Sequence, residues 1–147
     1  MAPAVAAPAK VLILDKTTSV AEDISYAVAQ NLGYQTERSI ATNEPLAVQR
    51  FLAQEWDAVV CNWATTGAQG LDLMKRFRAM DPDVGLLIFT GRSQDEIPSA
   101  ALKAGLDECL VLSANRERAL GDALRKVVAT QSGRRKARER KAEQTGA

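Results

Sequence analysis

Histidine is absent from this chain of 147 residues, and its absence excludes several kinds of chemistry at once. A Ser-His-Asp triad, a Cys-His pair and a metal site built on imidazole each need at least one histidine. Cysteine is nearly absent as well: Cys61 and Cys109 are too few for a disulfide framework or for a zinc site made of four thiolates. The apolar runs are far shorter than the ~20 residues of a membrane span, so we predict no membrane contact.

Net charge is also small, but it is unevenly distributed. The 19 Lys and Arg residues and the 18 Asp and Glu residues give a formal charge of +1. Residues 132–147 hold six basic and two acidic side chains, which leaves 13 basic and 16 acidic groups, a net charge of −3, for residues 1–131. A basic tail on a mildly acidic body is typical of a solvated helix end, and in some proteins of a contact with nucleic acid.

Three regions of the chain differ in composition. Residues 1–9 form an Ala/Pro arm without the charged start and apolar stretch of a signal peptide, so we expect a disordered arm on a cytoplasmic protein. Residues 10–131 alternate apolar runs with helical periods and form the predicted domain. Residues 132–147 form a basic tail rich in helix formers, which follows a predicted interruption at Gln131-Ser132-Gly133.

Local signals mark where the helices of the domain begin and end. Ser19 and Glu22 form a capping-box pattern at the start of the first helix, and Gly33 is placed to end it. Asn43 and Pro45 fit the start of the second helix. The predicted strands are 11–14, 34–40, 58–61, 84–89 and 109–112, the predicted helices are 19–32, 43–52, 71–80, 95–104 and 116–129, and a Thr/Gly-rich loop is predicted at 64–70.

Most of the predicted strands are continuous apolar runs without polar alternation. Such runs favour a parallel sheet that is covered by helices on both faces and joined by right-handed crossovers, so the predicted fold is a doubly wound three-layer α/β/α sandwich. The more polar run at 34–40 is predicted near a sheet edge. In this fold the functional site lies at the carboxyl ends of the central strands. These ends are Asp15-Lys16, Asn62-Trp63, Thr90-Gly91 and Leu112-Ser113.

Several motifs occur in a specific order and at specific separations. They are the apolar strand that runs into Asp15-Lys16, the strand that ends at Asn62, the segment Gly70-Leu71-Asp72-Leu73-Met74, the triplet Phe89-Thr90-Gly91, and the segment 105–111. In these features residues 10–129 resemble the receiver domain of bacterial response regulators. The resemblance implies a CheY-like, flavodoxin-like fold with five strands in the order 2-1-3-4-5. An unrelated doubly wound domain is the alternative.

The departures from the family pattern concern charge. Asn62 stands where the resemblance places the phosphoacceptor aspartate, Lys16 replaces the second metal-binding acid, and Leu112 replaces the phosphate-binding lysine. Only Asp15 and the switching hydroxyl of Thr90 match. Because phosphoryl transfer depends on such positioned charges, we predict a degenerate pseudo-receiver that is not an enzyme and has no metal and no cofactor.

Two local consequences follow from these replacements. The Lys16 ammonium could turn toward Asp15 and Asn62, where a metal ion would lie; the alternative is a solvated loop lysine. The Leu112–Ser113 peptide bond is predicted to be trans, because a cis bond before a residue other than proline costs ~2.5–4 kcal/mol.

The cysteines and tryptophans have structural interpretations. Cys61 and Cys109 are predicted to pack in the core without a disulfide, and Cys109 occupies the place of the family's switching aromatic residue. Trp63 is expected beside the vestigial site, and Trp56 is expected to be partly buried.

The resemblance also implies a function that depends on surface contacts. We predict a phosphorylation-independent protein–protein interaction module in two-component-type signal transduction. Its partner would be a histidine kinase, a phosphotransfer protein or an output protein, and it could form a homodimer. The family's contact face of helix four, strand five and helix five corresponds here to Ile97, Ala101, Leu110, Arg116 and Arg118. Ordinary surface packing of these residues is the alternative.

Two further functions stay open on the sequence. The basic tail could extend the last helix into a linker, or contact nucleic acid through its phosphates, although no base-reading motif accompanies it. The vacated phosphorylation pocket could instead bind a small molecule, but nothing in the sequence identifies a ligand.

Overall fold

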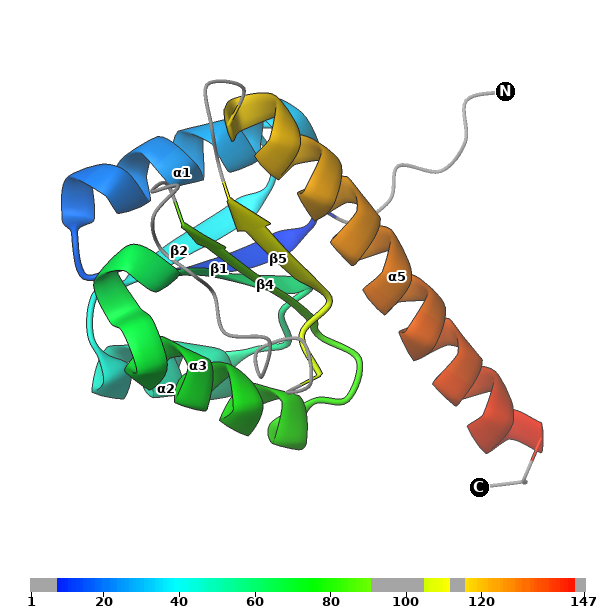
Figure 1. Cartoon of the computed structure of the whole chain (residues 1–147). Helices are drawn as coiled ribbons and strands as arrows, with labels where there is room; N and C mark the ends of the chain where they lie inside the picture. Colours follow the sequence, from blue (N-terminus) through cyan, green and yellow to red (C-terminus); the bar gives the residue numbers. More distant parts are fainter. Residues whose placement is uncertain (1–7, 91–104, 112–115, 145–147) are drawn as a thin grey trace.

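The computed structural model describes residues 8–90, 105–111 and 116–144, without the side chains of residues 116 and 117 (Figure 1). The described strands are β1 (Lys10–Leu14), β2 (Glu37–Ala41), β3 (Ala58–Asn62), β4 (Gly85–Thr90) and β5 (Glu108–Val111). The described helices are α1 (Thr18–Leu32), α2 (Glu44–Ala53), α3 (Trp63–Met80) and α5 (Arg116–Gln144). The helix predicted at 95–104 and the Leu112–Ser113 bond lie outside the described residues.

All five strands form one parallel sheet in the order β2-β1-β3-β4-β5, as the resemblance implied. β2 is an edge strand, as its polar sequence predicted, although it begins three residues later than expected. The carboxyl ends of the strands share one side of the sheet, which we call the carboxyl edge. Their starts share the opposite side, the amino edge.

Helices cover both faces of the sheet (Figure 1). α1 and α5 lie on one face, and α2 and α3 lie on the other. The side chains of β1 alternate between the two resulting cores, because Val11 and Ile13 pack under α1 and α5 while Leu12 and Leu14 pack under α2 and α3. A strand buried on both faces needs apolar residues at every position, which explains the continuous apolar runs and confirms the three-layer sandwich.

The ends of α1 and α2 test the capping predictions. The capping box at Ser19 was wrong: α1 begins one residue earlier, after Thr17, whose side chain makes no capping hydrogen bond. Gly33 ends this helix as predicted, with a φ of 107° that favours glycine. Asn43 precedes α2, and its Oδ1 accepts a hydrogen bond from the backbone N–H of Leu46 at 2.9 Å.

α3 begins within the segment that the sequence predicted as a loop. The predicted loop at 64–70 was wrong, because α3 follows β3 directly and contains one non-helical residue, Gly67, with a φ of 55°. The Thr66 hydroxyl donates to the carbonyl oxygen of Asn62 at 2.8 Å, which supports this first turn. Gly70 permits a close approach, since a Cβ there would lie 2.1 Å from the Thr66 Oγ1.

α5 runs without a break from residue 116 to residue 144, so the interruption predicted at Gln131-Ser132-Gly133 was wrong. Gln131 is buried, and its Nε2 donates to the Asp57 Oδ1 at 2.9 Å, which holds the helix against the body at this point. Beyond it, the helix passes the amino edge and projects away from the sheet (Figure 1). Among the described helices, none combines the length and apolar character needed to cross a membrane.

Candidate functional site at the carboxyl edge

Asp15 and Asn62 lie in direct contact at the carboxyl edge. They follow or end the neighbouring strands β1 and β3, and their exposed fractions are only 1% and 4%. The Asn62 Nδ2 donates to the Asp15 Oδ2 at 2.8 Å, and the Asn62 Oδ1 accepts from the backbone N–H of Ala64 at 3.1 Å. Both ends of the amide are therefore bonded, one to the carboxylate and one to the start of α3.

The second oxygen of Asp15 is also satisfied by uncharged groups. Its Oδ1 accepts from the Thr65 hydroxyl and from the backbone N–H of Thr17, each at 2.9 Å. Thr65 was not among the predicted site residues, although segment 64–70 is rich in threonine. A buried carboxylate needs such donors, and here all three of them are neutral.

Lys16 does not contribute its charge to this site. Its backbone N–H donates to the Thr65 Oγ1 at 3.3 Å, and its side chain is exposed. Among the residues that the structure describes, no ion pair joins Lys16 to Asp15, so of the two alternatives the structure shows the exposed loop lysine. The amide of Asn62 already bonds the carboxylate, and the exposed ammonium keeps its hydration.

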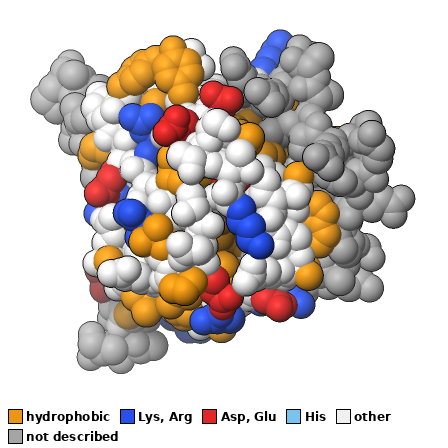
Figure 2. Space-filling view, turned by 90° about the vertical axis from the view of Figure 1, so that its left-hand side faces the viewer, with side chains coloured by type: hydrophobic (Ala, Val, Ile, Leu, Met, Phe, Trp, Pro, Cys, Tyr) orange, Lys and Arg blue, Asp and Glu red, His pale blue; other side chains and the backbone are white. Residues whose placement is uncertain are grey.

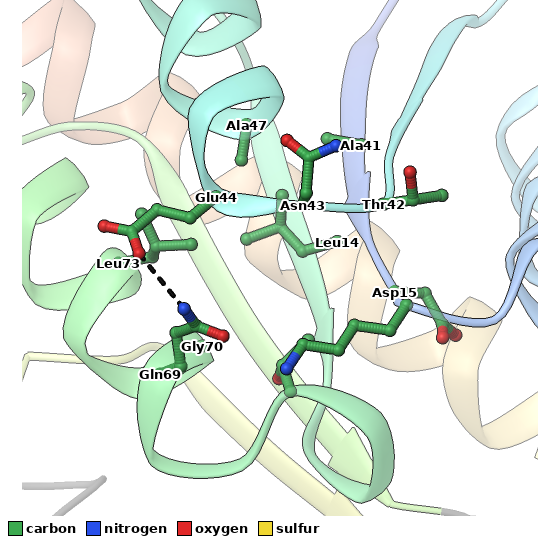
Figure 3. A pocket seen from close by; sticks show the side chains of 12 residues that line it. Leu14, Asp15, Ala41, Thr42, Asn43, Glu44, Ala47, Gln69, Gly70 and Leu73 are labelled. Carbon is green, nitrogen blue, oxygen red and sulfur yellow. Dashed lines mark hydrogen bonds between the residues drawn. The ribbon is translucent and has the colours of Figure 1, made fainter.

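A small cavity lies beside Asp15, between the end of β1, the start of α2 and the first turns of α3 (Figure 3). Glu44 and Gln69 close one side, where the Gln69 Nε2 donates to the Glu44 Oε2 at 3.1 Å, and Asp15 lies on the other. Its volume is about 20 Å³, which is room for roughly one water molecule. Figure 2 looks onto this side of the molecule and shows basic, acidic and hydrophobic side chains interspersed.

The remaining site residues are placed as follows. Thr90 is fully buried at the end of β4, next to Val111 of β5 in the strand register. Leu112 lies outside the described residues. Trp63 is half-buried and directly follows Asn62, whereas Trp56 is only 2% exposed and so more deeply buried than predicted.

Both cysteines are free thiols, which confirms that no disulfide joins them. Burial raises the pKa of the Cys61 thiol to about 12, although its contact with the Thr66 Oγ1 at 3.1 Å lowers it somewhat. Burial also raises the pKa of Cys109, which is half-buried on β5. Neither thiol is therefore a reactive thiolate at neutral pH.

The predicted contact face is only partly described. Leu110 is half-buried and packs against the core under α1 and α5, and Arg118 is exposed on α5. Ile97, Ala101 and the side chain of Arg116 lie outside the described residues. Within the described ranges, no three His, Cys, Asp or Glu side chains gather into a metal-binding group.

A second cluster of charged residues, at the amino edge, was not predicted from the sequence. Five carboxylates there face arginines of α3 and α5. We call these five residues the acidic rim: Glu55, Asp57, Asp81, Asp83 and Asp107. The only signal in the sequence was the opposite charge of the tail and the body.

Comparison with known proteins identifies the family. The family described as "Response regulator receiver domain" matches residues 11–125. The chain belongs to this family. No curated protein sequence matches this receiver domain.

Solved structures share the fold of this receiver domain at low sequence identity. A receiver domain of an HD domain-containing protein from Pseudomonas fluorescens Pf-5 superposes with a TM-score of 0.72 at 17% identity, covering 92% of this chain and 97% of that one. TrrA from Thermotoga maritima, in complex with Mg(2+)-BeF, gives 0.67 at 21% identity, covering 81% and 98%. NtrX from Brucella abortus, in complex with ADP, gives 0.77 at 14% identity, covering 95% of this chain and 30% of that one.

Proposed function

We propose that this receiver domain is a pseudo-receiver, a phosphorylation-independent protein–protein interaction module in two-component-type signal transduction. The observation that carries the proposal is the 2.8 Å hydrogen bond from the Asn62 amide to the Asp15 carboxylate. The neutral Asn62 amide stands where the receiver family has an aspartate. It stabilises the Asp15 carboxylate by a hydrogen bond, so no metal ion or ammonium group is needed there.

The chemistry of Asn62 supports this proposal. A carboxamide is neutral and a poor nucleophile, so it does not form an acyl phosphate. Its oxygen is also engaged, since it accepts from the Ala64 N–H at the start of α3. Attack by this group would break the cap of the helix as well as the contact with Asp15.

The residues at this edge do not fit a magnesium ion. Mg²⁺ prefers several hard oxygen ligands and carries two positive charges. Among the described residues of this edge, Asp15 is the one buried carboxylate, and its two oxygens already accept three hydrogen bonds. The adjacent Lys16 supplies no oxygen ligand, and its side chain is exposed. Magnesium-dependent phosphorylation of Asn62 is therefore not part of the proposed function.

Receiver domains act by contacting kinases or output domains, and we propose that this one binds a histidine kinase, a phosphotransfer protein or an output protein. The side formed by β5 and the first half of α5 is the proposed contact, and it is also the proposed homodimer face. Val111, an apolar side chain with an exposed fraction of 52%, supports this choice together with Arg118.

The two alternative functions receive less support. The cavity beside Asp15 has room for about one water molecule, which is too small for a metabolite. Three arginines of the basic tail are bonded to carboxylates of the domain, so their charge is neutralised internally rather than presented to nucleic acid.

Incubation with acetyl phosphate and Mg²⁺, followed by intact-mass measurement, tests the proposal. We expect no adduct on the wild-type chain. The double variant Lys16→Asp, Asn62→Asp restores both missing acids and is the control for a receptive site. A stoichiometric, base-labile phosphoryl adduct on the wild type would overturn the proposal.

A second readout uses Trp63 emission in a Trp56→Phe background, titrated with Mg²⁺ and then with beryllofluoride. We expect a flat trace. A saturable change would show that the unmodified site accepts a phosphoryl analogue, and would contradict the proposal.

A further inference from the structure

The acidic rim concentrates negative charge where the strands begin. Glu55 and Asp57 precede β3, Asp81 and Asp83 precede β4, and Asp107 precedes β5. Four of these side chains have exposed fractions of 22% or less, and only Glu55 is mostly exposed. Charges withdrawn from water to this extent require partners.

Arg134 of α5 is one such partner. Its Nη1 lies 2.7 Å from the Asp107 Oδ1 and its Nη2 lies 3.2 Å from the Oδ2, so the guanidinium spans the carboxylate. The same Nη2 donates to the carbonyl oxygens of Asp83 at 2.9 Å and Val84 at 3.1 Å. Arg134 therefore joins the loop before β4 to the residue before β5.

Arg135 reaches the other side of the rim. Its Nε lies 2.6 Å from the Glu55 Oε1. Its Nη1 lies 3.4 Å from the Asp57 Oδ1, and its Nη2 lies 3.4 Å from the Asp81 Oδ2. Its Nη2 also donates to the carbonyl oxygen of Trp56 at 3.2 Å. One guanidinium thus binds the loops before β3 and before β4.

The contacts follow one face of the helix. Arg138 pairs with the nearly buried Asp83 carboxylate, and Gln131 bonds Asp57. Residues 131, 134, 135 and 138 recur at spacings of three and four, so they continue the face that Leu124 and Val127 present to the sheet. From residue 131 onward, α5 contacts the domain through polar and charged side chains in place of apolar ones.

The other basic residues of this segment do not take part. Within the described ranges, Lys136, Arg140 and Lys141 form no ion pair. The 14 residues 131–144 continue a packed helix and need no new nucleus, but they have no apolar face, so their position against the domain depends on polar contacts. Among the described residues, the side-chain hydrogen bonds and ion pairs that join this segment to the domain come from Gln131 and from the three arginines 134, 135 and 138.

We propose that Arg134, Arg135 and Arg138 form a releasable ionic clamp on the acidic rim. The clamp holds residues 131–138 against the domain and so fixes the direction of residues 131–144, the α5 extension; loss of its charge pairs frees the extension while the sheet stays folded. This proposal does not rest on the proposed function of the carboxyl edge, because it involves none of the same residues.

Amide hydrogen exchange of the full chain tests the clamp. The clamp variant is Arg134→Gln, Arg135→Gln, Arg138→Gln, and the matched control is Lys136→Gln, Arg140→Gln, Lys141→Gln, which removes the same charge from the same helix. We expect amides 131–138 to exchange at least about tenfold faster in the clamp variant than in the control, with β1, β3 and β4 equally protected in both.

Salt provides a second test that needs no substitution. Between roughly 0.05 and 1 M salt the screening length falls to about 3 Å, so exchange of amides 131–138 should accelerate in the wild type and the control but not in the clamp variant. Equal exchange in the two variants, or a wild type insensitive to salt, would overturn the proposal. So would sheet amides that lose protection together with the extension. If the clamp variant does not fold, the wild-type salt series decides.

Discussion

The two edges of the sheet satisfy their buried carboxylates in opposite ways. At the carboxyl edge, Asp15 accepts three hydrogen bonds from neutral donors, one of them the Asn62 amide. At the amino edge, the acidic rim faces guanidinium groups, and Asp107 alone contacts both Arg78 and Arg134. Hydrogen bonds from neutral donors respond little to salt, whereas ion pairs are screened by it. The salt-dependent behaviour of this receiver domain is therefore expected at the amino edge.

The largest effect is expected from removing the charge of Asp107. Asp107→Asn leaves Arg78 and Arg134 without their common carboxylate and weakens the bond to the Leu86 N–H, now at 2.8 Å. We expect a loss of about 2–4 kcal/mol in the free energy of unfolding, measured by urea denaturation. The control is Asp72→Asn on the exposed side of α3, which should change it by less than ~0.5 kcal/mol. Equal losses of stability in the two variants would show that the ion-paired Asp107 contributes no more than the exposed Asp72.

Acid should abolish the same stabilisation. Burial alone would raise the pKa of Asp107, but the hydrogen bond and charge of Arg134, the Leu86 N–H and the charge of Arg78 outweigh it and hold the pKa below the ordinary 3.8. A carboxylate with a lowered pKa stabilises the fold above its unfolded-state pKa and loses that contribution as the pH falls through the folded-state value.

Unfolding curves of the wild type and Asp107→Asn, measured from pH 7 downward, check this directly. The difference between them should be constant at neutral pH and should shrink only below about pH 4. If the difference in unfolding free energy already shrinks between pH 7 and pH 5, a group other than Asp107 is responsible for it.

The carboxyl edge is expected to react to the reverse substitution. Asn62→Asp puts two carboxylates in contact without a cation, so we expect a loss of about 1–3 kcal/mol at neutral pH that is recovered on acidification. The control is Asn43→Asp, which also caps a helix but has no carboxylate as its hydrogen-bond partner. Aspartate is as good a cap as asparagine, so this control should be nearly neutral. Thermal unfolding at pH 7 and pH 4.5 distinguishes the two variants.

The smallest effect is expected within α5. Gly133 lies in the α5 extension, where an added Cβ would meet no atom within 4 Å beyond the adjoining helix backbone, so Gly133→Ala should stabilise the helix by about 0.5–1 kcal/mol and slow exchange around the clamp. At Gly121 an added Cβ would lie 2.0 Å from the Asn31 Oδ1, where α5 crosses α1. Gly121→Ala should therefore destabilise, and a gain at both sites would contradict the structure.

Much of the fold could be predicted because it depends on local pattern. The apolar runs at Val11–Leu14 and Ala58–Cys61 identify strands buried on both faces, and Gly33 and Asn43 mark helix ends by their own backbone and side-chain chemistry. The first turn of α3 was missed because threonine and glycine have weak helix propensity. The bond from Thr66 to the Asn62 carbonyl and the tight fit of Gly70 compensate for it.

The candidate site was only partly predictable. Topology alone brings Asp15 and Asn62 together, but which donor satisfies the carboxylate depends on side-chain geometry, and Asn62 rather than Lys16 fills that place. The path of α5 was missed for a related reason. Gln131 and Asp57 are 74 residues apart in the chain, and no local pattern reveals a partner at that separation.

The length of α5 has a mechanical consequence. The segment from Gln131 to Gln144 spans roughly 21 Å at 1.5 Å per residue, so a tilt of about 10° at its base swings its tip by roughly 4 Å. Small rearrangements among the arginine contacts are thus magnified into a displacement comparable to a side-chain diameter. A group held at this tip would therefore be displaced whenever the loops that precede β3, β4 and β5 rearrange.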